Sequence, residues 1–475
     1  MHNSRRSPSV ISIALLSGLL SGCAVAPDLG PLSQLRTSQS LASATSLSAP
    51  EGGWPADEWW RQWNDPQLGR LIAMAEHDAP DLAVAQARMR AAQGIAEQAG
   101  AALRPVVGAD ASAGLAKQSY NNGIPAEFVP HGWQDIGQAQ ISLNWSLDFW
   151  GRNRAALAAA TSDAKAAGIE VAQARLLLAT GITGAYVDLA GLYADRDVAE
   201  RAVAVRQDSF RLVGQRATNG LDNQAEYKQA ESRLASARAD LAAIDETIGI
   251  ARNRIAALAG QGPDFGQSIT RPRLDAPAAF TLPGRTGIDI IGRRPDIAAA
   301  RLRAQAAASR TKAARAAFYP NISLGALIGL QSLGLSNLVE SGSTMGDIGP
   351  AISLPIFQGG RLSGQFRQAR AEYDEAVANY DATLLHALNE VADSATSLRA
   401  LEVQRREAGH ALAAAEQAYA LAEQRYRGGL STYLDVLVAE DALLASRRAM
   451  ADLDSRAYTL NVMLVRALGG GFSVT

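Results

Sequence analysis

Residues 212–241 read LVGQRATNGLDNQAEYKQAESRLASARADL, and they lie without a gap over residues 421–450, which read LAEQRYRGGLSTYLDVLVAEDALLASRRAM. Identical residues stand at corresponding places in the two stretches: Gln215/Gln424, Arg216/Arg425, Gly220/Gly429, Leu221/Leu430 and Arg238/Arg447. A second ungapped pair is Pro80–Pro105 over Pro295–Pro320, and both members begin with Pro-Asp. Alanine bias inflates some of these matches, but it does not explain the paired prolines or the shared Gln-Arg and Gly-Leu. A long internal duplication indicates that one structural unit is used twice.

The amino terminus carries the signals of secretion. Arg5 and Arg6 precede an apolar run, Val10–Leu20, that is too short to span a bilayer and predicts a secretory signal peptide. The run ends in Leu-Ser-Gly directly before Cys23, the only cysteine of the sequence. This placement resembles the bacterial lipoprotein signal, which implies removal of residues 1–22 and a covalent lipid such as palmitate on Cys23. The residue after Cys23 is alanine rather than aspartate, which in such lipoproteins indicates the outer membrane. An ordinary signal peptide with an incidental cysteine is the alternative.

Composition excludes several classes of partner. The 475 residues carry a formal net charge of −2, and no basic stripe or polybasic tail predicts nucleic-acid binding. Hydrophobic residues make up 48% of the sequence, but many of them are alanine, and no mature segment is a run of large apolar residues long enough for a membrane helix. If the chain crosses a membrane, we expect it to do so with strands.

Two long segments without proline predict long helices. His131–Gly262 and Ile356–Thr475 contain no proline and are rich in the best helix formers. A helix from Gly151 to Gly220 would be roughly 100 Å long at about 1.5 Å per residue. We expect long helical hairpins over residues 151–260 and 361–468. Their alanine-rich apolar stripes bury little area, so packing against other chains is expected.

Four segments between the helices alternate apolar and polar residues, at about residues 105–118, 135–150, 320–331 and 346–357. In the second of them Trp145 belongs to the apolar set and Asn144 to the polar set. This period predicts strands with one apolar and one polar face, as in a transmembrane barrel, with Trp145 facing lipid and Asn144 facing the lumen. Four strands cannot close a barrel, because even the smallest have about eight. Closure therefore needs more than one chain.

Aromatic residues stand where these strands meet the helices: Phe149, Trp150, Phe318, Tyr319 and Phe357. Rings at one level are expected of a girdle at a membrane interface. A soluble sandwich, whose aromatic residues pack under loops, is the alternative. Pro350 and Pro355 weaken the fourth strand, because proline cannot donate a ladder hydrogen bond.

Taken together, several motifs resemble the TolC family of outer-membrane efflux ducts, and within it the lipidated OprM or NodT type. The resemblance covers residues 50–470. The matching motifs are Trp59-Trp60 through Asp65-Pro66-Gln67-Leu68, Phe149-Trp150-Gly151-Arg152, Arg293-Arg294-Pro295-Asp296, Phe318-Tyr319-Pro320, Gly359-Gly360-Arg361 and Gln424-Arg425-Tyr426 with Gly429-Leu430.

The resemblance implies a mainly α fold with a membrane β-barrel. Three chains would build a 12-stranded β-barrel that continues into a periplasmic α-helical barrel. After the signal peptide, it implies a lipidated segment at 23–79 that packs on an equatorial region, a first repeat at 80–262, an equatorial linker at 263–294 and a second repeat at 295–475. Four tryptophans of the first segment could stack on a ligand, but we expect them to pack it onto that region: Trp54, Trp59, Trp60 and Trp63.

The resemblance also assigns roles near the two helix turns. The residues expected to contact a periplasmic adaptor protein are Gly220, Leu221, Gly429 and Leu430. The residues expected near the periplasmic gate are Leu434, Asp435, Val438 and Asp441. Leu434 matches the leucine of the family's closing ring, whereas Val438 and Asp441 replace its aspartate and arginine, so the polar ring is displaced or absent. Plain helix caps explain the two glycines equally well, and a solvated helix face would explain Asp435.

No catalytic constellation is present in the sequence. The five histidines are scattered, with no metal-binding spacing, and neither a nucleophile elbow nor a phosphate-binding loop occurs. We therefore expect no enzyme, no metal and no cofactor apart from the lipid. The resemblance implies a passive homotrimeric duct that carries small molecules from an inner-membrane pump to the outside. A lipid-anchored periplasmic coiled-coil scaffold without transport activity is the alternative, and the exported compounds are not readable from the sequence.

Overall fold

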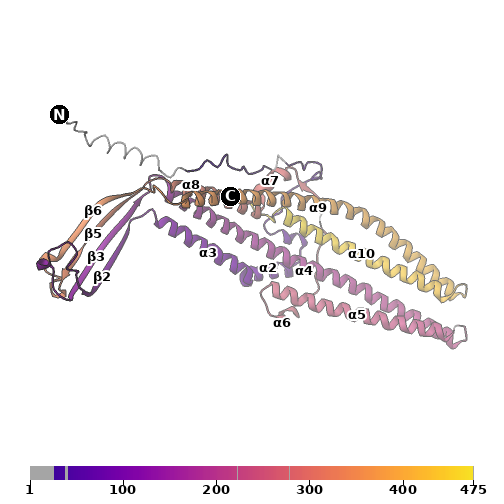
Figure 1. Cartoon of the computed structure of the whole chain (residues 1–475). Helices are drawn as coiled ribbons and strands as arrows, with labels where there is room; N and C mark the ends of the chain where they lie inside the picture. The colour runs from indigo at the N-terminus through magenta and orange to yellow at the C-terminus, as the bar shows by residue number, and fades with distance from the viewer. Residues whose placement is uncertain (1–25, 38–40, 222, 278, 474–475) are drawn as a thin grey trace. The chain divides into compact units, whose positions relative to one another are not determined.

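The computed structural model describes residues 26–37, 41–221, 223–277 and 279–473 (Figure 1). The predicted signal peptide and Cys23 lie outside these residues. The first copy of the repeated unit contains α3 (Pro80–Ala101), β2 (Val106–Ala116), β3 (Gln134–Leu147), α4 (Arg152–Thr218) and α5 (Gln224–Leu258). The second copy contains α8 (Pro295–Ala316), β5 (Asn321–Leu333), β6 (Thr344–Ser353), α9 (Arg361–Arg427) and α10 (Tyr433–Ala467).

Corresponding helices of the two copies have the same lengths. α3 and α8 have 22 residues each, α4 and α9 have 67, and α5 and α10 have 35. Short elements connect the copies or precede them: β1 (Glu51–Gly52), η2 (Trp59–Trp63), α2 (Pro66–Asp78), α6 (Pro263–Gly266), β4 (Leu282–Pro283) and α7 (Thr286–Arg293). The strand connections contain η3 (Ala126–Phe128), η4 (Leu335–Asn337) and η5 (Ser341–Ser343). The fold is mainly helical, as predicted.

The chain forms two compact units. The strand unit comprises the described residues of Met1–Leu35, Met89–Ala167 and Ala300–Tyr380. The hairpin unit comprises the described residues of Arg36–Arg88, Gly168–Ala299 and Asp381–Thr475. We name α4 with α5 hairpin 1, and α9 with α10 hairpin 2.

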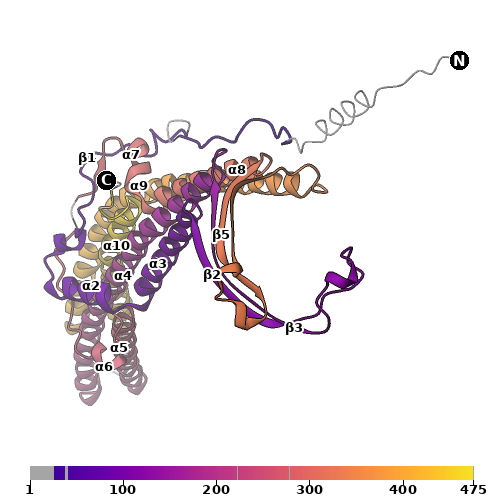
Figure 2. The ribbon, with the colours of Figure 1, turned by 90° about the vertical axis from the view of Figure 1, so that its left-hand side faces the viewer.

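The strand unit contains one antiparallel sheet in the order β2-β3-β5-β6, curved as Figure 2 shows. Ile141 of β3 pairs with Ala109 of β2 and with Ile328 of β5. Since paired residues lie on the same side of a sheet, the apolar positions of neighbouring strands form one continuous face. Ile141 is 53% exposed and Ile328 is 69% exposed, so the middle of this face has no cover within the described chain. The predicted alternation of the strands is confirmed.

Within the described residues the sheet is open, with β2 and β6 at its two edges. Pro350 lies inside β6 opposite Leu324. A proline is tolerated there because an edge strand leaves one side of its backbone without a sheet partner. The fourth strand therefore forms despite the proline that weakens its pattern.

Trp145 lies near the end of β3 rather than at its centre. It is three residues from the start of the connection to α4, and its indole N–H donates a hydrogen bond to the Leu103 carbonyl over 3.1 Å. Trp145 is 37% exposed. An indole with an apolar ring and a satisfied N–H is typical of an interfacial position.

The hairpin unit has an aromatic core. Trp59, Trp60 and Trp63 are buried, and they pack with residues of α2 and α4 such as Ile72 and Tyr186. Trp63 meets Trp59 edge to face with ring centroids 6.0 Å apart. The predicted packing role of these three tryptophans is confirmed.

α4 is the one described helix with an 18-residue stretch apolar enough for a membrane span, and 44% of that stretch is buried. Its buried residues include Ile182, Tyr186 and Leu189 of the aromatic core. Part of the apolar composition of this helix is therefore used in packing within the hairpin unit.

A buried guanidinium joins the start of the second copy to hairpin 2. Arg294 is 7% exposed, and its side chain donates to both carboxylate oxygens of Asp296 over 3.0 and 2.6 Å. It also donates to Glu390 over 2.6 Å and to the Ala467 carbonyl over 3.0 Å. These bonds satisfy a buried charge, which explains why arginine suits this position of the Arg-Arg-Pro-Asp motif.

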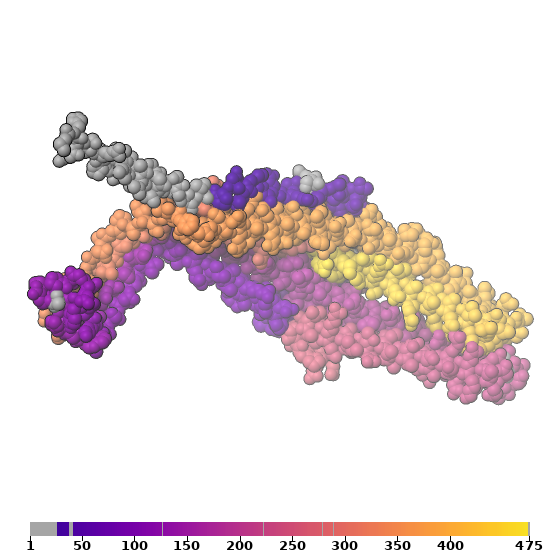
Figure 3. All heavy atoms as spheres, viewed as in Figure 1, coloured from indigo at the N-terminus to yellow at the C-terminus, as the bar shows by residue number. Residues whose placement is uncertain are grey.

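The segment that precedes β1 runs along α9, where its atoms lie on those of the helix in the space-filling view (Figure 3). In the strand unit, the Ser33 hydroxyl donates to Asp374 over 2.7 Å and Tyr373 donates to the Ser33 carbonyl over 2.7 Å. In the hairpin unit, the Arg36 amide donates to Asp381 over 3.0 Å. Side chains of α9 therefore hold a segment whose described residues, 26–37 and 41–50, form no helix or strand.

Candidate functional site

At the turn of hairpin 1, α4 ends in two backbone hydrogen bonds. The Leu221 amide donates to the Arg216 carbonyl over 2.9 Å, and the Gly220 amide donates to the Ala217 carbonyl over 3.1 Å. Gly220 has a φ of 73°, the left-handed conformation that glycine adopts without strain. This combination is the Schellman motif of helix ends.

The turn of hairpin 2 repeats this geometry. The Leu430 amide donates to the Arg425 carbonyl over 2.8 Å, the Gly429 amide donates to the Tyr426 carbonyl over 3.0 Å, and Gly429 also has a φ of 73°. The two glycines are thus accounted for by the turns themselves.

Leu221 and Leu430 are exposed, by 64% and 74%. In a Schellman motif this position commonly packs against the side chain five residues earlier, but Arg216 and Arg425 occupy that place here. The intrachain contact that would bury the leucines is therefore missing. Each turn presents a leucine side chain to its surroundings.

A cluster of buried side chains joins the two hairpins just behind these turns. It contains Val213, Ala230, Tyr426, Tyr433, Val436 and Leu437. The Arg216 guanidinium lies 4.5 Å from the centre of the Tyr426 ring, which adds a cation–π contact between α4 and α9. Contacts among α4, α5, α9 and α10 therefore hold the two turns beside each other within the hairpin unit.

The expected gate residues fall into two groups. Leu434 and Val438, one helical turn apart at the start of α10, are 63% and 64% exposed. Asp435 accepts hydrogen bonds from the Thr432 amide over 2.9 Å and the Thr432 hydroxyl over 2.8 Å, so it closes the start of the helix. These bonds hold the pKa of Asp435 below its usual range.

Asp441 belongs to an ion-pair cluster that joins the hairpins. Arg233 donates to its two carboxylate oxygens over 3.0 and 2.8 Å. The neighbouring Glu440 is 1% exposed and accepts from Arg206 over 3.2 Å and from Ser209 over 3.3 Å. Burial raises the pKa of the Glu440 carboxyl, and the Arg206 guanidinium opposes this shift. Burial first, and then Glu440, raises the pKa of Tyr433 to about 12.

The sequence does not single out Arg206, Ser209 and Glu440 as a site. Arg206 and Glu440 are 234 residues apart, so no local spacing links them. One signal is available: Ala415 and Ala418 stand in α9 where Arg206 and Ser209 stand in α4. Two polar residues in the first copy at positions that are alanine in the second copy could therefore have indicated this site.

Four of the five predicted girdle residues are exposed. Phe149, Trp150, Tyr319 and Phe357 are 64%, 51%, 43% and 87% exposed, and the rings of Trp150 and Tyr319 stack at 4.8 Å. For Phe318 the prediction of a girdle position is wrong. It is 7% exposed and meets Phe366 edge to face, in a cluster with Leu362. A ring that is buried in its own chain cannot contact lipid.

In the parts of the chain that the structure describes, no group of three or more His, Cys, Asp or Glu side chains could hold a metal ion.

Known proteins resemble the chain over most of its length. The family model described as "Outer membrane efflux protein" matches residues 71–261 and 289–470. The solved structure of the outer membrane protein VceC from Vibrio cholerae is 45% identical, with a TM-score of 0.84 over 88% of this chain and 100% of that chain. Among curated relatives, the multidrug resistance outer membrane protein MdtP of Escherichia coli K12 is 30% identical over 462 residues, 96% of this chain and 94% of that protein. The fusaric acid resistance protein FusA of Burkholderia cepacia is 34% identical over 371 residues, 76% of this chain and 69% of that protein.

Members of this family are channels, not enzymes. They lie in the outer membrane, extend into the periplasm, and work as trimers with a periplasmic adaptor and an inner-membrane pump. The predicted TolC family, the outer-membrane location and the partners are confirmed. The chain belongs to the outer membrane efflux protein family and is the outer-membrane channel of a tripartite efflux system.

Proposed function

We propose that the two exposed leucines of the turns, Leu221 and Leu430, are the anchors through which the channel docks its adaptor protein. The observation that carries the proposal is that two identical turns each leave a leucine uncovered. An apolar side chain on a rigid turn is a suitable anchor, because little conformational freedom is lost on binding.

The test replaces Leu221 and Leu430 together by aspartate. Burying an unpaired carboxylate in an apolar contact costs several kcal/mol, so we expect export to be lost while the trimer remains in the outer membrane. Asn219→Asp is the matched control, because it adds a charge to the same exposed turn without removing a leucine. Full export by the double variant in cells that lack other ducts would remove support for the leucines as anchors.

Three copies of the four-stranded sheet would close into the 12-stranded barrel. Two features support this proposal: the sheet has two open edges, and its apolar face is exposed. Ile141→Arg should therefore cost roughly 2–4 kcal/mol near the membrane midplane. Gln140→Arg, on the opposite face, should fold and change ion selectivity. Equal loss of barrel assembly by both variants would speak against this assignment of faces.

The periplasmic gate would be formed by Leu434 and Val438 rather than by a ring of acidic side chains. Both side chains are apolar and exposed on one side of α10, whereas Asp435 and Asp441 are engaged in bonds within the chain. If three copies of this pair narrow the opening, serine at both positions should raise the resting conductance in planar bilayers. An unchanged conductance would leave the gate elsewhere.

We assign the lipid anchor to Cys23, which lies outside the described residues. Cys23→Ser should abolish acyl labelling and impair localisation, and normal palmitate incorporation would contradict the assignment. The cargo would be small organic compounds, since the relatives MdtP and FusA are named for multidrug and fusaric acid resistance. Drug susceptibility of a strain with and without this channel would test that range.

A further inference from the structure

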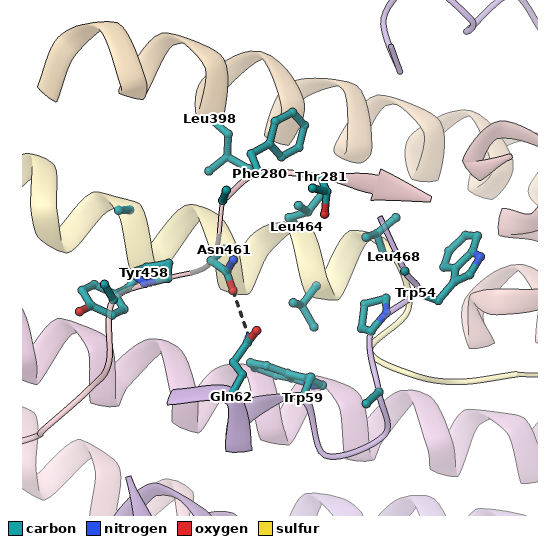
Figure 4. A pocket seen from close by; sticks show the side chains of 18 of the residues that line it. Trp54, Trp59, Gln62, Phe280, Thr281, Leu398, Tyr458, Asn461, Leu464 and Leu468 are labelled. Carbon is teal, nitrogen blue, oxygen red and sulfur yellow. Dashed lines mark hydrogen bonds between the residues drawn. The ribbon is translucent and has the colours of Figure 1, made fainter. Parts of the chain in front are cut away.

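The hairpin unit contains a cavity of about 1130 Å³ that the efflux path does not account for. Its walls come from the segment before η2, from the linker before β4 and from hairpin 2 (Figure 4). Trp54, Trp59 and Phe280 supply aromatic surface, and Leu398 and Leu464 supply aliphatic surface. The lining combines this apolar surface with polar and charged side chains, and a hollow of this size is large enough for a small molecule.

The polar side chains that line the cavity mostly satisfy one another. Gln62 donates to Asn461 over 3.4 Å, as Figure 4 shows. Arg405 pairs with Asp454 at 2.6 Å, and Arg61 pairs with Glu58 at 2.8 Å.

Glu402 is the exception among the charged lining residues. Asp57, the remaining acid, pairs at 3.4 Å with Arg175, which is not part of the lining. Within the described chain Glu402 has neither an ion-pair partner nor a hydrogen-bond partner. Glu402 is also exposed, so its carboxylate can be reached by a ligand as well as by solvent.

Hairpin 1 offers an internal comparison, because its corresponding groove is filled. Leu189 and Ile255 correspond to Leu398 and Leu464, and they pack with Ile269 in the aromatic core. Phe265 and Leu274 pack against the same core. The chain itself thus fills the groove of hairpin 1, whereas the described residues leave a hollow beside Leu398 and Leu464 of hairpin 2, which are 9% and 6% exposed.

The segment that fills the first groove also brings a cation. Arg271 lies 5.4 Å from the centre of the Tyr193 ring and pairs with Asp197 at 2.7 Å. Tyr193 is the counterpart of Glu402 in the duplicated helix. The segment that fills the first groove thus places one of its two arginines, Arg271, over the tyrosine, and the second groove has a carboxylate at the place of that tyrosine.

We infer that the cavity beside hairpin 2 binds a small organic cation with an aromatic or branched apolar body. The apolar body would pack against Phe280 and the accessible edges of Leu398 and Leu464. The charge would lie near Glu402 and the face of Phe280, because the Arg293 guanidinium already lies 5.4 Å from the centre of the Trp54 ring. The ring quadrupoles and the carboxylate attract the same sign of charge, so the site discriminates by charge as well as by shape.

The test uses two ions of the same shape and opposite charge, tetraphenylphosphonium and tetraphenylborate. Calorimetric titration of the full-length protein in nanodiscs, with empty nanodiscs subtracted, should show tighter binding of the cation by about tenfold or more. Glu402→Gln should weaken cation binding about fivefold and leave the anion unaffected. Glu407→Gln is the matched control, because it removes the same charge from an exposed place on α9 outside the cavity.

A second variant tests the location of the site. Phe280→Ala removes a ring from the cavity wall and should weaken cation binding about fivefold. Equal affinity for both ions, or equal effects of Glu402→Gln and Glu407→Gln, would overturn the inference. Unchanged cation binding by both Glu402→Gln and Phe280→Ala would place the bound ion outside this cavity and also overturn it.

Discussion

Hairpins 1 and 2 are built alike in their backbone and in several of their bonds. Both have helices of 67 and 35 residues, and both turn through a glycine with a φ of 73°. Arg196 pairs with Asp245 in hairpin 1 at 2.6 Å, and Arg405 pairs with Asp454 at corresponding places in hairpin 2, also at 2.6 Å. The two copies have therefore kept the same helix lengths, the same turn geometry and one equivalent ion pair.

The two hairpins differ where they meet other parts of the chain. Glu231 and Glu440 are the same residue at the same place in the repeat. Glu231 is exposed and pairs with Lys228 on its own helix, whereas Glu440 is buried and pairs with Arg206 of hairpin 1. A residue's role in a duplicated fold therefore follows from its partner rather than from its place in the repeat.

The largest expected effect separates these two glutamates. Glu440→Ala leaves Arg206, whose side chain is 17% exposed, with a 3.5 Å contact to Asp441 and a 3.3 Å bond to the Arg233 carbonyl, and it should lower the free energy of unfolding by about 3 kcal/mol. Glu231→Ala removes a surface pair and should have little effect. Thermal unfolding of the solubilised trimer measures both variants.

A double replacement serves as the control for this prediction. Arg206→Met with Glu440→Leu exchanges the buried pair for apolar side chains and should restore most of the lost stability. If Glu440→Ala and Glu231→Ala lower the free energy of unfolding by equally small amounts, the cluster does not hold the hairpins together.

The next prediction concerns the likeness of the two turns. Because Leu221 and Leu430 have the same backbone geometry and similar exposure, we expect Leu221→Asp and Leu430→Asp to weaken adaptor binding equally, each by about tenfold. Their effects should multiply in the double variant if the two contacts are independent. Titration of the purified adaptor against the channel in nanodiscs gives the three affinities. Unequal single effects would show that the adaptor distinguishes the hairpins despite their common geometry.

Local patterns predicted most of the fold. Segments without proline gave the hairpins, alternation gave the strands and their faces, and the Gly-Leu pairs gave the turns. Each of these signals lies within one element, where spacing along the chain determines geometry.

Contacts between distant elements escaped prediction. Phe318 follows a helix and precedes a strand, as a girdle residue would, but its burial depends on Phe366, 48 positions later in the chain. The Arg206–Glu440 pair and the open groove of hairpin 2 likewise depend on which helices pack together. No single-element pattern carries that information.

The smallest expected effect lies at the starts of α5 and α10, where the two caps use different chemistry. In hairpin 1 the Asn223 side chain accepts from the Ala225 and Glu226 amides over 2.9 and 3.1 Å, and Glu226 accepts from the Asn223 amide over 3.0 Å. In hairpin 2 the amide and the hydroxyl of Thr432 both donate to the Asp435 carboxylate. In hairpin 1 one of these three bonds ends on a carboxylate, that of Glu226, and the two bonds to the Asn223 amide oxygen persist at every pH, whereas in hairpin 2 both bonds end on a carboxylate and weaken on its protonation.

Acid should therefore loosen the start of α10 before it loosens the start of α5. The pKa of Asp435 is lower in the folded chain than its ordinary value of 3.8, so its contribution to stability is present above that value and is lost as the pH falls through the lowered pKa. Hydrogen exchange, corrected for the intrinsic rate at each pH, should show faster opening at residues 432–436 below about pH 4 and a smaller change at residues 223–227. Asp435→Ala, which removes the acceptor, should produce the same faster opening already at neutral pH and remove the acid dependence. If opening of the two helix starts depends on pH to the same extent, the two caps are stabilised in the same way and this prediction is wrong.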